Sequence, residues 1–426
     1  MTGTTTIGHV TARRVWDSRG RPTVEADVIL QNGSIGRAIA PAGASTGSGE
    51  ALDLRDGGPK LGGFDVTKAI DNIKTVISPA LKGLVASDQA SVDQTLLELD
   101  GTQNKTKLGG NAMIAVSMAT LHAAAQQQPL WQFLLGDNSP LLPLPEIQIF
   151  GGGAHAGRRV DVQDFMVMPV GATSFAQALE WTAEVYRSAG VLLSDAGTLQ
   201  GVADEGGFWP VFNTNEDALD CLVKAIERAG YTPGEEVAIA LDIAATEFFH
   251  DGRYHLARDR HECDRDELSE LLVRWIDRYP ILSIEDPLAE HDTIGMQRFT
   301  QSVGDRIQVI GDDYLVTNAL RVERASREQA CNGLLVKPNQ AGTITETRAA
   351  LDAARHAGFS TIVSARSGET EDITIAHLAV GWSAGQIKVG AFARSERMAK
   401  WNELLRIEEV LGASAKFAGA SVIRRD

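Results

Sequence analysis

Four short hydrophobic runs, each ending in an acidic residue or a lysine, constrain the fold of this chain more than any other feature. The runs end at Asp242, Glu285, Asp312 and Lys337. Each is rich in Val, Ile and Leu and is followed by a helical pattern, which is typical of strands buried in a parallel sheet. When such strand–helix units close into a barrel, the side chains at the C-terminal strand ends meet at one mouth, where catalysis takes place. The sequence therefore predicts a β/α barrel with a charged catalytic mouth.

The charges at these strand ends indicate a metal site. Three carboxylates that meet at one mouth would repel one another strongly unless a hard divalent cation lay between them. Asp242, Glu285 and Asp312 are therefore predicted to bind Mg²⁺, which prefers oxygen ligands. Lys337, beside that cation, is a candidate general base.

The first 140 residues have a different pattern. Alternating runs near residues 7–15, 23–30 and 35–40 are separated by turn signals that include Asn32-Gly33, a pair that tolerates positive φ angles. Helical patterns follow, and a proline-spaced segment at residues 140–145 marks a boundary. We expect an α+β capping domain over residues 1–140 and a TIM-like barrel over residues 141–426, because 426 residues exceed the roughly 250 of one barrel.

The composition excludes several classes of partner. Fifty-six acidic residues against 40 basic ones give a formal net charge of −16, which argues against nucleic acid and against an anionic membrane surface. The three cysteines form no CxxC pair, and the first 17 residues lack the apolar core of a signal peptide. These features predict a cytoplasmic protein, in which an anionic substrate would need local positive charge and a metal.

Several loops after predicted strands carry polar groups that are suited to a ligand. The small-residue loop 43–47 contains Ser45, and the loop 203–207 contains Glu205; both are also compatible with plain turns. Arg366, after the predicted strand 360–364, could grip a phosphate or form an ordinary surface ion pair. Lys388 ends another predicted strand. A group of three histidines and a cysteine has irregular spacing and is better explained as a solvated hairpin than as a metal cluster: His250, His255, His261 and Cys263.

Six segments in the same order resemble motifs of the enolase family, and the resemblance extends over nearly the whole chain. They include loop residues of the capping domain and strand ends of the barrel, and the ending Leu405-Arg-Ile-Glu-Glu409 is also similar. The segments are Trp16-Asp-Ser-Arg-Gly-Arg-Pro-Thr-Val-Glu25, Pro41-Ala-Gly-Ala-Ser-Thr-Gly47, Asp204-Glu-Gly-Gly207, Ser283-Ile-Glu-Asp286, Lys337-Pro-Asn-Gln340 and Ser367-Gly-Glu-Thr-Glu-Asp372.

The resemblance implies a role for each candidate residue. It implies two Mg²⁺ ions per active site, the second arriving with the substrate, and a lysine base facing them, which is the enolase-superfamily arrangement. The matching residues are Asp242, Glu285 and Asp312 as ligands of the tighter ion, Ser45 for the second ion, Lys337 as base, Glu205 as acid, Arg366, Ser367 and His155 on the phosphate side, and Lys388 and Gln163 at the substrate carboxylate. It also implies a homodimer, in which Glu25 and Arg406 pair across the interface.

The sequence departs from the family pattern on the acid side of the reaction. Ala365 replaces a histidine, Asp164 replaces a glutamate, and Gly151 replaces the usual asparagine. Phe208-Trp209 stands where the family tends to have Tyr-Ala, and a bulky Trp209 would suit a reshaped leaving-group pocket. The metal, base and phosphate sets are kept, so the sequence favours enolate formation and weakens the case for protonation of the departing hydroxyl.

Three hypotheses follow. The first is an enolase that converts 2-phosphoglycerate to phosphoenolpyruvate. The second is an enolase paralogue acting on a related phosphate or phosphonate, such as carboxyphosphonoenolpyruvate synthase. The third is a non-catalytic binding or structural protein, which the intact set of converging carboxylates disfavours.

Overall fold

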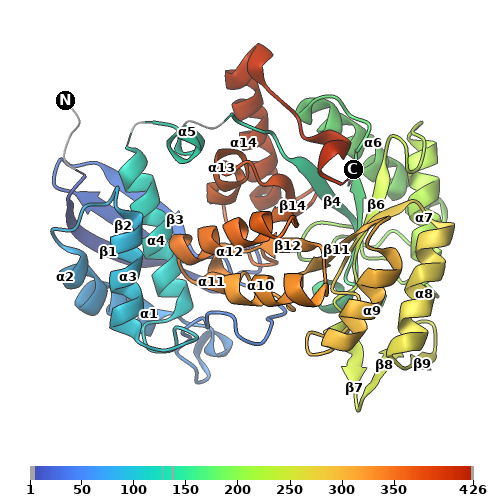
Figure 1. The fold of residues 1–426 in the computed structure, drawn as a ribbon, viewed down its shortest axis with the longest axis horizontal. Helices are drawn as coiled ribbons and strands as arrows, with labels where there is room; N and C mark the ends of the chain where they lie inside the picture. The colour runs from blue at the N-terminus through green and yellow to red at the C-terminus, as the bar shows by residue number, and fades with distance from the viewer. Residues whose placement is uncertain (1–4, 127, 137–138, 424–426) are drawn as a thin grey trace.

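The structure, a computed structural model, describes residues 5–126, 128–136 and 139–423. A smaller N-terminal part lies beside a closed barrel, as the expected fold class requires (Figure 1). The boundary that the sequence places at residue 140 falls between the last helix of the N-terminal part and the first barrel strand. Its position stays a prediction.

The N-terminal part consists of an antiparallel three-stranded sheet covered by helices. Gly33, at the predicted Asn32-Gly33 turn, has a φ of 86°. A Cβ atom at Gly36 would lie 2.1 Å from the carbonyl oxygen of Ala119, so the alanine-rich helix α4 packs directly on the sheet backbone. The elements are β1 (Ile7–Trp16), β2 (Pro22–Leu30), β3 (Ile35–Ile39), α1 (Thr67–Asn72), α2 (Ser78–Leu81), α3 (Gln89–Asp100), α4 (Gly110–Ala125) and α5 (Leu130–Leu135).

Eight strands close the barrel in the order β10-β11-β12-β13-β14-β4-β5-β6. Their side chains are almost entirely buried, because one face lines the barrel interior and the other packs against helices. The strands are β4 (Leu144–Gly151), β5 (Asp164–Met168), β6 (Ala238–Asp242), β10 (Ile281–Glu285), β11 (Gln308–Gly311), β12 (Gly333–Val336), β13 (Ser360–Ser364) and β14 (Gly385–Ala391).

Strand β5 runs antiparallel to both of its neighbours, β4 and β6. The strands for which the sequence predicts a parallel sheet, β6, β10, β11 and β12, are parallel to one another. Strand β5 differs because no α-helix lies between β4 and β5 to make a parallel crossover. The reversal puts Asp164, the first residue of β5, opposite Asp242, the last residue of β6. Both residues therefore reach the same mouth of the barrel.

Residues 160–163, directly before this strand, form an irregular loop. The backbone amides of Asp161 and Val162 donate to Oδ1 of Asn215 at 3.1 and 3.3 Å. The side chain of Asn215 is completely buried. This side chain accepts the backbone hydrogen bonds that Asp161 and Val162 would otherwise donate to a neighbouring strand. Strand β5 therefore begins at Asp164.

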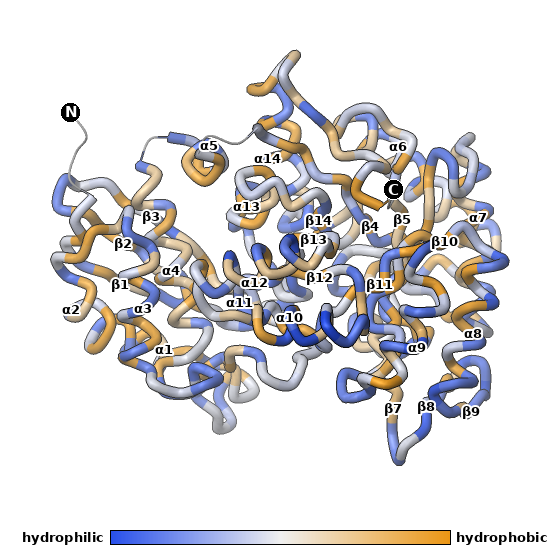
Figure 2. Tube along the Cα trace, in the orientation of Figure 1, coloured by the Kyte–Doolittle hydropathy of each residue, from blue (hydrophilic) through white to orange (hydrophobic). Residues whose placement is uncertain are grey.

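The remaining helices surround the barrel strands (Figure 1). In Figure 2 helix α10 is coloured mainly hydrophilic, as expected of a helix on the outside. The predicted histidine-rich hairpin is confirmed as a small antiparallel sheet of β7 (Phe249–His250), β8 (Arg253–Leu256) and β9 (His261–Cys263). The helices are α6 (Phe175–Asp195), α7 (Asn215–Arg228), α8 (Arg265–Arg278), α9 (Thr293–Val303), α10 (Ala319–Glu328), α11 (Pro338–Ala341), α12 (Ile344–His356), α13 (Thr374–Gly381) and α14 (Ser395–Leu411). Within the described ranges, no helix combines the length and apolarity that a membrane span needs.

Loops of the N-terminal part dock onto the barrel mouth. Ala42 and Gly368 exchange two backbone hydrogen bonds, each 2.9 Å long, and the amide of Ser18 donates to the carbonyl of Glu369 at 2.8 Å. The guanidinium of Arg19 donates to Oγ of Ser367 at 3.3 Å. These contacts hold the small-residue loop 43–47 against the end of β13.

Candidate active site

Most of the residues singled out in the sequence line one cavity at the barrel mouth. Asp164, Glu285 and Asp312 are outside its lining, but each contacts a residue within it. The described residues that line the cavity are Ala44, Ser45, His155, Gln163, Glu205, Asp242, Lys337, Ser364, Ala365, Arg366, Ser367 and Lys388.

Lys388 lies between two of the predicted metal ligands. Its Nζ atom donates to Oδ2 of Asp242 at 2.9 Å and to Oε2 of Glu285 at 2.8 Å. Although burial alone would lower it, the charges of these two carboxylates raise the pKa of Lys388 well above its usual value. Burial and the charge of Asp242 raise the pKa of Glu285 well above its usual value.

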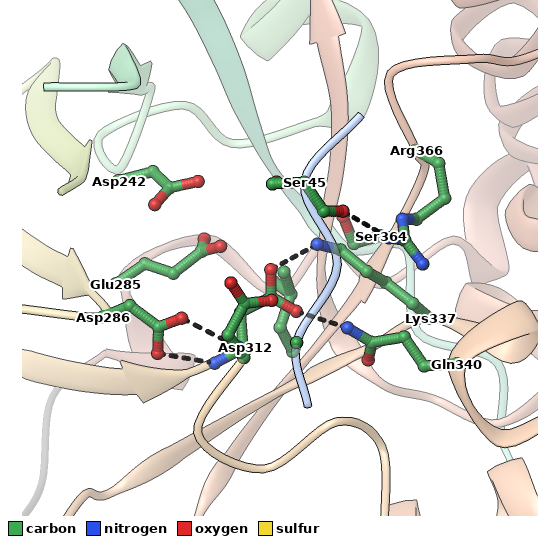
Figure 3. Close-up of polar contacts among 12 residues, drawn as sticks. Ser45, Asp242, Glu285, Asp286, Asp312, Lys337, Gln340, Ser364 and Arg366 are labelled. Atoms are coloured by element: carbon green, nitrogen blue, oxygen red, sulfur yellow. Dashed lines mark hydrogen bonds and ion pairs between the residues drawn. The ribbon is translucent and has the colours of Figure 1, made fainter. Parts of the chain in front are cut away.

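Lys337 and Asp312 form a second ion pair at the mouth (Figure 3). Gln340 Nε2 donates to Oδ1 of Asp312 at 2.9 Å, so both carboxylate oxygens are engaged. Asp286 accepts the backbone amides of Asp312 and Asp313 at 3.0 and 2.7 Å. Although burial would lower it, the charge of Asp312 raises the pKa of Lys337.

The three predicted metal ligands do not form the tightest cluster of acidic groups. Among the described residues, the triads whose ligand atoms all lie within 4.8 Å of one another are His155–Asp164–Glu205 and Asp286–Asp312–Asp313. The reason is that the two lysines separate the predicted set. Lys388 holds Asp242 and Glu285, while Lys337 turns Asp312 toward itself.

The donor atoms at the mouth nevertheless fit a hard divalent cation. Asp242, Glu285 and Asp312 offer carboxylate oxygens, which are the atoms that such a cation prefers. Among the described residues, Glu285 Oε1 and Gln163 Oε1 are buried without a hydrogen-bond partner. A buried oxygen that lacks a partner is costly unless a ligand satisfies it.

Arg366 is a buried cation in the lining of the cavity, not a surface ion pair. It is only 4% exposed and donates to Oε2 of Glu50 at 2.9 Å, to Oδ1 of Asn339 at 3.0 Å and to the carbonyl of Ser45 at 3.0 Å. Burial would lower the pKa of Arg366, but the charge of Glu50 raises it. The guanidinium is thus a permanent positive charge beside Ser367.

A second buried arginine supports this part of the site from helix α14. Arg397 has no exposed surface, and it donates to the carbonyl oxygens of Arg366 at 2.7 Å, Ser367 at 2.6 Å and Val389 at 2.9 Å. It therefore fixes the backbone of the two residues whose side chains are predicted to meet phosphate.

The acid side of the cavity brings together His155, Asp164 and Glu205. His155 Nδ1 lies 3.3 Å from Oδ1 of Asp164, and its Nε2 lies 3.9 Å from Oε1 of Glu205. Burial would raise the pKa of Asp164, but the charges of His155 and Lys388 lower it. Burial would lower the pKa of His155, but the charges of Glu205 and Asp164 raise it. The two cationic groups, His155 and Lys388, thus stabilise the carboxylate of Asp164.

Of the residues that depart from the family pattern, Ala365 lies in the cavity wall and Trp209 does not. Ala365 is 6% exposed and lines the cavity. Trp209 is not among the described residues that line the cavity, and its predicted effect on the leaving-group pocket stays a prediction. Its ring lies under the guanidinium of Arg159, 4.4 Å away, and Phe208 stacks on Tyr186 at 4.4 Å.

Sequence reasoning missed several residues that hold the site. Glu50 follows the small-residue loop, but its partners Arg366 and Gln340 are far away in sequence. Gln148 and Glu146 interrupt the apolar run of β4 at alternate positions, a signal that both side chains face the same side of the strand. That signal was available in the sequence.

The fold and the site agree with the family matches. Residues 7–134 match the family described as "Enolase, N-terminal domain". Residues 139–426 match the family described as "Enolase, C-terminal TIM barrel domain". Together these two matches cover nearly the whole sequence, and the chain belongs to the enolase family.

Proposed function

We propose that this chain is a Mg²⁺-dependent lyase that interconverts 2-phosphoglycerate and phosphoenolpyruvate through an enolate. The observation that carries the proposal is the cavity itself. The proposal is supported by its lining, which includes Lys337, Asp242 and Arg366. Removal of a proton next to a carboxylate requires a base, and here the amine of Lys337 can serve. It also requires positive charge to stabilise the enolate, which metal ions held by carboxylate oxygens can supply, while Arg366 can bind the phosphate.

In this proposal Asp242, Glu285 and Asp312 would hold one Mg²⁺, and the loop residue Ser45 would meet a second. When bound, the ions would supply positive charge against the developing enolate. Arg366, Ser367 and His155 would hold the phosphate, while Lys388 and Gln163 would contact the substrate carboxylate. All of these side chains except Glu285 and Asp312 line the cavity.

The proposed reaction has two proton transfers. Lys337 takes the proton from the carbon that bears the phosphate, and the electron pair of the broken C–H bond passes into the enolate. The bond from the next carbon to its hydroxyl then breaks, and the electron pair of the enolate forms the new double bond. The hydroxyl takes a proton from Glu205 and leaves as water.

Proton removal and water loss are expected to differ in rate. With Mg²⁺, the protein should incorporate deuterium at the α position of 2-phosphoglycerate, because Lys337 is in place. Formation of phosphoenolpyruvate should be slow, because Ala365 supplies no imidazole and Asp164 is short. A missing acid–base group costs about 10²–10⁴-fold. Nuclear magnetic resonance of the substrate and a product assay measure the two rates in one sample.

The matched variant restores the family residues. Ala365→His combined with Asp164→Glu should raise the rate of water loss while exchange of the α proton changes by less than about threefold. Ala365 lines the cavity, and Trp209 is not among the described residues that do, so Trp209 is not expected to occupy the space of the new imidazole. Water loss by the unaltered chain at the speed of an ordinary enolase would contradict this interpretation of Ala365 and Asp164.

The second candidate is a paralogue that uses the same enolate geometry on a related phosphate or phosphonate, as carboxyphosphonoenolpyruvate synthase does. Ala365 in the cavity wall favours it, since it removes a side chain on the leaving-group side and leaves the base side intact. Absence of Mg²⁺-dependent exchange with 2-phosphoglycerate would favour the paralogue. A panel of phosphonate analogues would then identify the substrate class.

We also propose a homodimer that acts in the cytoplasm. Within one chain Glu25 accepts from Arg13 and Arg406 pairs with Glu403 at 2.8 Å, so a pair between Glu25 and the partner subunit's Arg406 would add to existing networks. Light scattering at micromolar concentration should give about twice the chain mass of 45.7 kDa. A particle of a single chain mass would contradict the dimer.

A further inference from the structure

Gln148, on strand β4, uses both ends of its side-chain amide at the acid side of the cavity. It is 1% exposed. Its Nε2 donates to Oδ1 of Asp164, and its Oε1 accepts the backbone amide of Gly207 at 2.8 Å. A buried amide with both ends engaged has one preferred position, so Gln148 connects the start of β5 with the loop 203–207.

Two glycines provide the space for this side chain. A Cβ atom at Gly151 would lie 3.3 Å from Nε2 of Gln148 and 2.6 Å from Cβ of Ala203. A Cβ atom at Gly207 would lie 2.5 Å from Oε1 of Gln148. Gly151 is the position where the family usually has asparagine, so this departure and the placement of Gln148 belong to one arrangement.

The groups that Gln148 connects are those assigned to the protonating step. Asp164 lies 3.3 Å from His155 Nδ1, and Glu205 Oε1 lies 3.9 Å from His155 Nε2. The carbonyl of Glu205 accepts the amide of Ala391 at 2.8 Å. The loop that carries Glu205 is therefore held from β14 on one side and from Gln148 on the other.

We propose that Gln148 is a positioning residue for protonation of the leaving group. It directs the shortened Asp164 against His155 and fixes the loop that carries Glu205. The inference rests on the proposed function: the C–O bond to the hydroxyl breaks, and the hydroxyl takes a proton from Glu205 and leaves as water. The described hydrogen bonds of Lys337 include none to Gln148, and its Nζ donates to Asp312. Removal of the α proton is therefore expected not to depend on Gln148.

Two variants test separately the two hydrogen bonds of the Gln148 side chain, to Asp164 and to the amide of Gly207. Gln148→Met loses both, whereas Gln148→Glu keeps an acceptor for Gly207 and places a carboxylate against Asp164. Both should lower water loss by about 10²-fold while deuterium exchange at the α position stays within about threefold. Amide hydrogen exchange of a peptide containing Gly207 should rise in Gln148→Met and stay slow in Gln148→Glu.

A length exchange tests whether the Gln148–Asp164 contact itself matters. Gln148→Asn alone should lose the contact, because the side chain is one methylene shorter. Gln148→Asn combined with Asp164→Glu should recover it, because the longer glutamate restores the combined length of the two side chains. Gln308→Met is the matched control. Gln308 is an equally buried glutamine of the barrel that contacts Gln386 instead of the site, and its replacement should leave both rates unchanged.

The outcomes distinguish this inference from the proposed function. Absence of exchange by the unaltered chain would refute the proposed function, and the Gly207 amide would still test the role of Gln148. An equal fall in exchange and water loss in Gln148→Met, or a fall in neither, would overturn the inference. So would an unchanged Gly207 amide in Gln148→Met.

Discussion

Lys337→Ala is expected to abolish both deuterium exchange at the α position and formation of phosphoenolpyruvate, each by about 10⁴-fold, the upper range for loss of a general base. Lys337 lines the cavity and is held by Asp312. Lys388, the other lysine of the site, is bound to Asp242 and Glu285 and is not placed to substitute for it. Both rates are measured in a single sample in deuterated buffer.

Lys105→Ala is the control for loss of a buried, ion-paired lysine. Lys105 is 8% exposed, and its Nζ lies 2.8 Å from Oε1 of Glu346, where the N-terminal part meets helix α12. Its removal should change stability more than either rate. Exchange that persists in Lys337→Ala at more than about a hundredth of the original rate would show that another group removes the proton.

Glu285→Gln is expected to weaken Mg²⁺ binding by at least about 100-fold. The substitution keeps the shape of the side chain but removes one of the three charges proposed to hold the ion, and replacement of even an indirect partner of a metal typically costs 10–100-fold. It also leaves the Nζ of Lys388 with one carboxylate fewer. Titration calorimetry with Mg²⁺ alone, without substrate, measures the effect independently of turnover.

Glu146→Gln makes the same chemical change elsewhere in the barrel interior. Glu146 is 2% exposed, accepts from Nε2 of Gln386 at 2.7 Å, and has a pKa that burial raises to about 7. A glutamine there keeps the accepting oxygen, so Mg²⁺ affinity should change by less than about threefold. Equal losses in the two variants would mean that the ion responds to total charge and not to Glu285 as a ligand. An unchanged affinity in Glu285→Gln would rule out the assignment.

The sequence predicted the barrel and the positions of its charged strand ends for a physical reason. A strand buried on both faces must be apolar, so a charge that ends such a run marks the point where the strand reaches the mouth. Asp242, Glu285 and Lys337 stand at these points in the structure. The reversed strand β5 could not be predicted, because its short apolar pattern is the same in either direction.

Which residues form the site could be predicted from the sequence more readily than which of them pair with one another. Glu50 pairs with Arg366 across 316 positions of the sequence, and no local pattern encodes such a pair. The positions of Lys337 and Lys388 were evident, but which carboxylates they pair with depends on how the closed barrel places each side chain. Charge type and strand position are local properties, whereas pairing is a property of the closed barrel.

The reversal of β5 also has a consequence for how this gene can change. Because the chain turns back between β4 and β5, Gln148, Asp164 and Glu205 fall within one uninterrupted segment that ends before β6. If recombination replaced this segment alone, it would transfer Gln148, Asp164 and Glu205 together. The gene region that encodes Lys337 would be unchanged. Ala365, encoded in the other region, would stay behind. An exchange of this segment would therefore carry Gly151 and Asp164 together, whereas Ala365 would have to change separately.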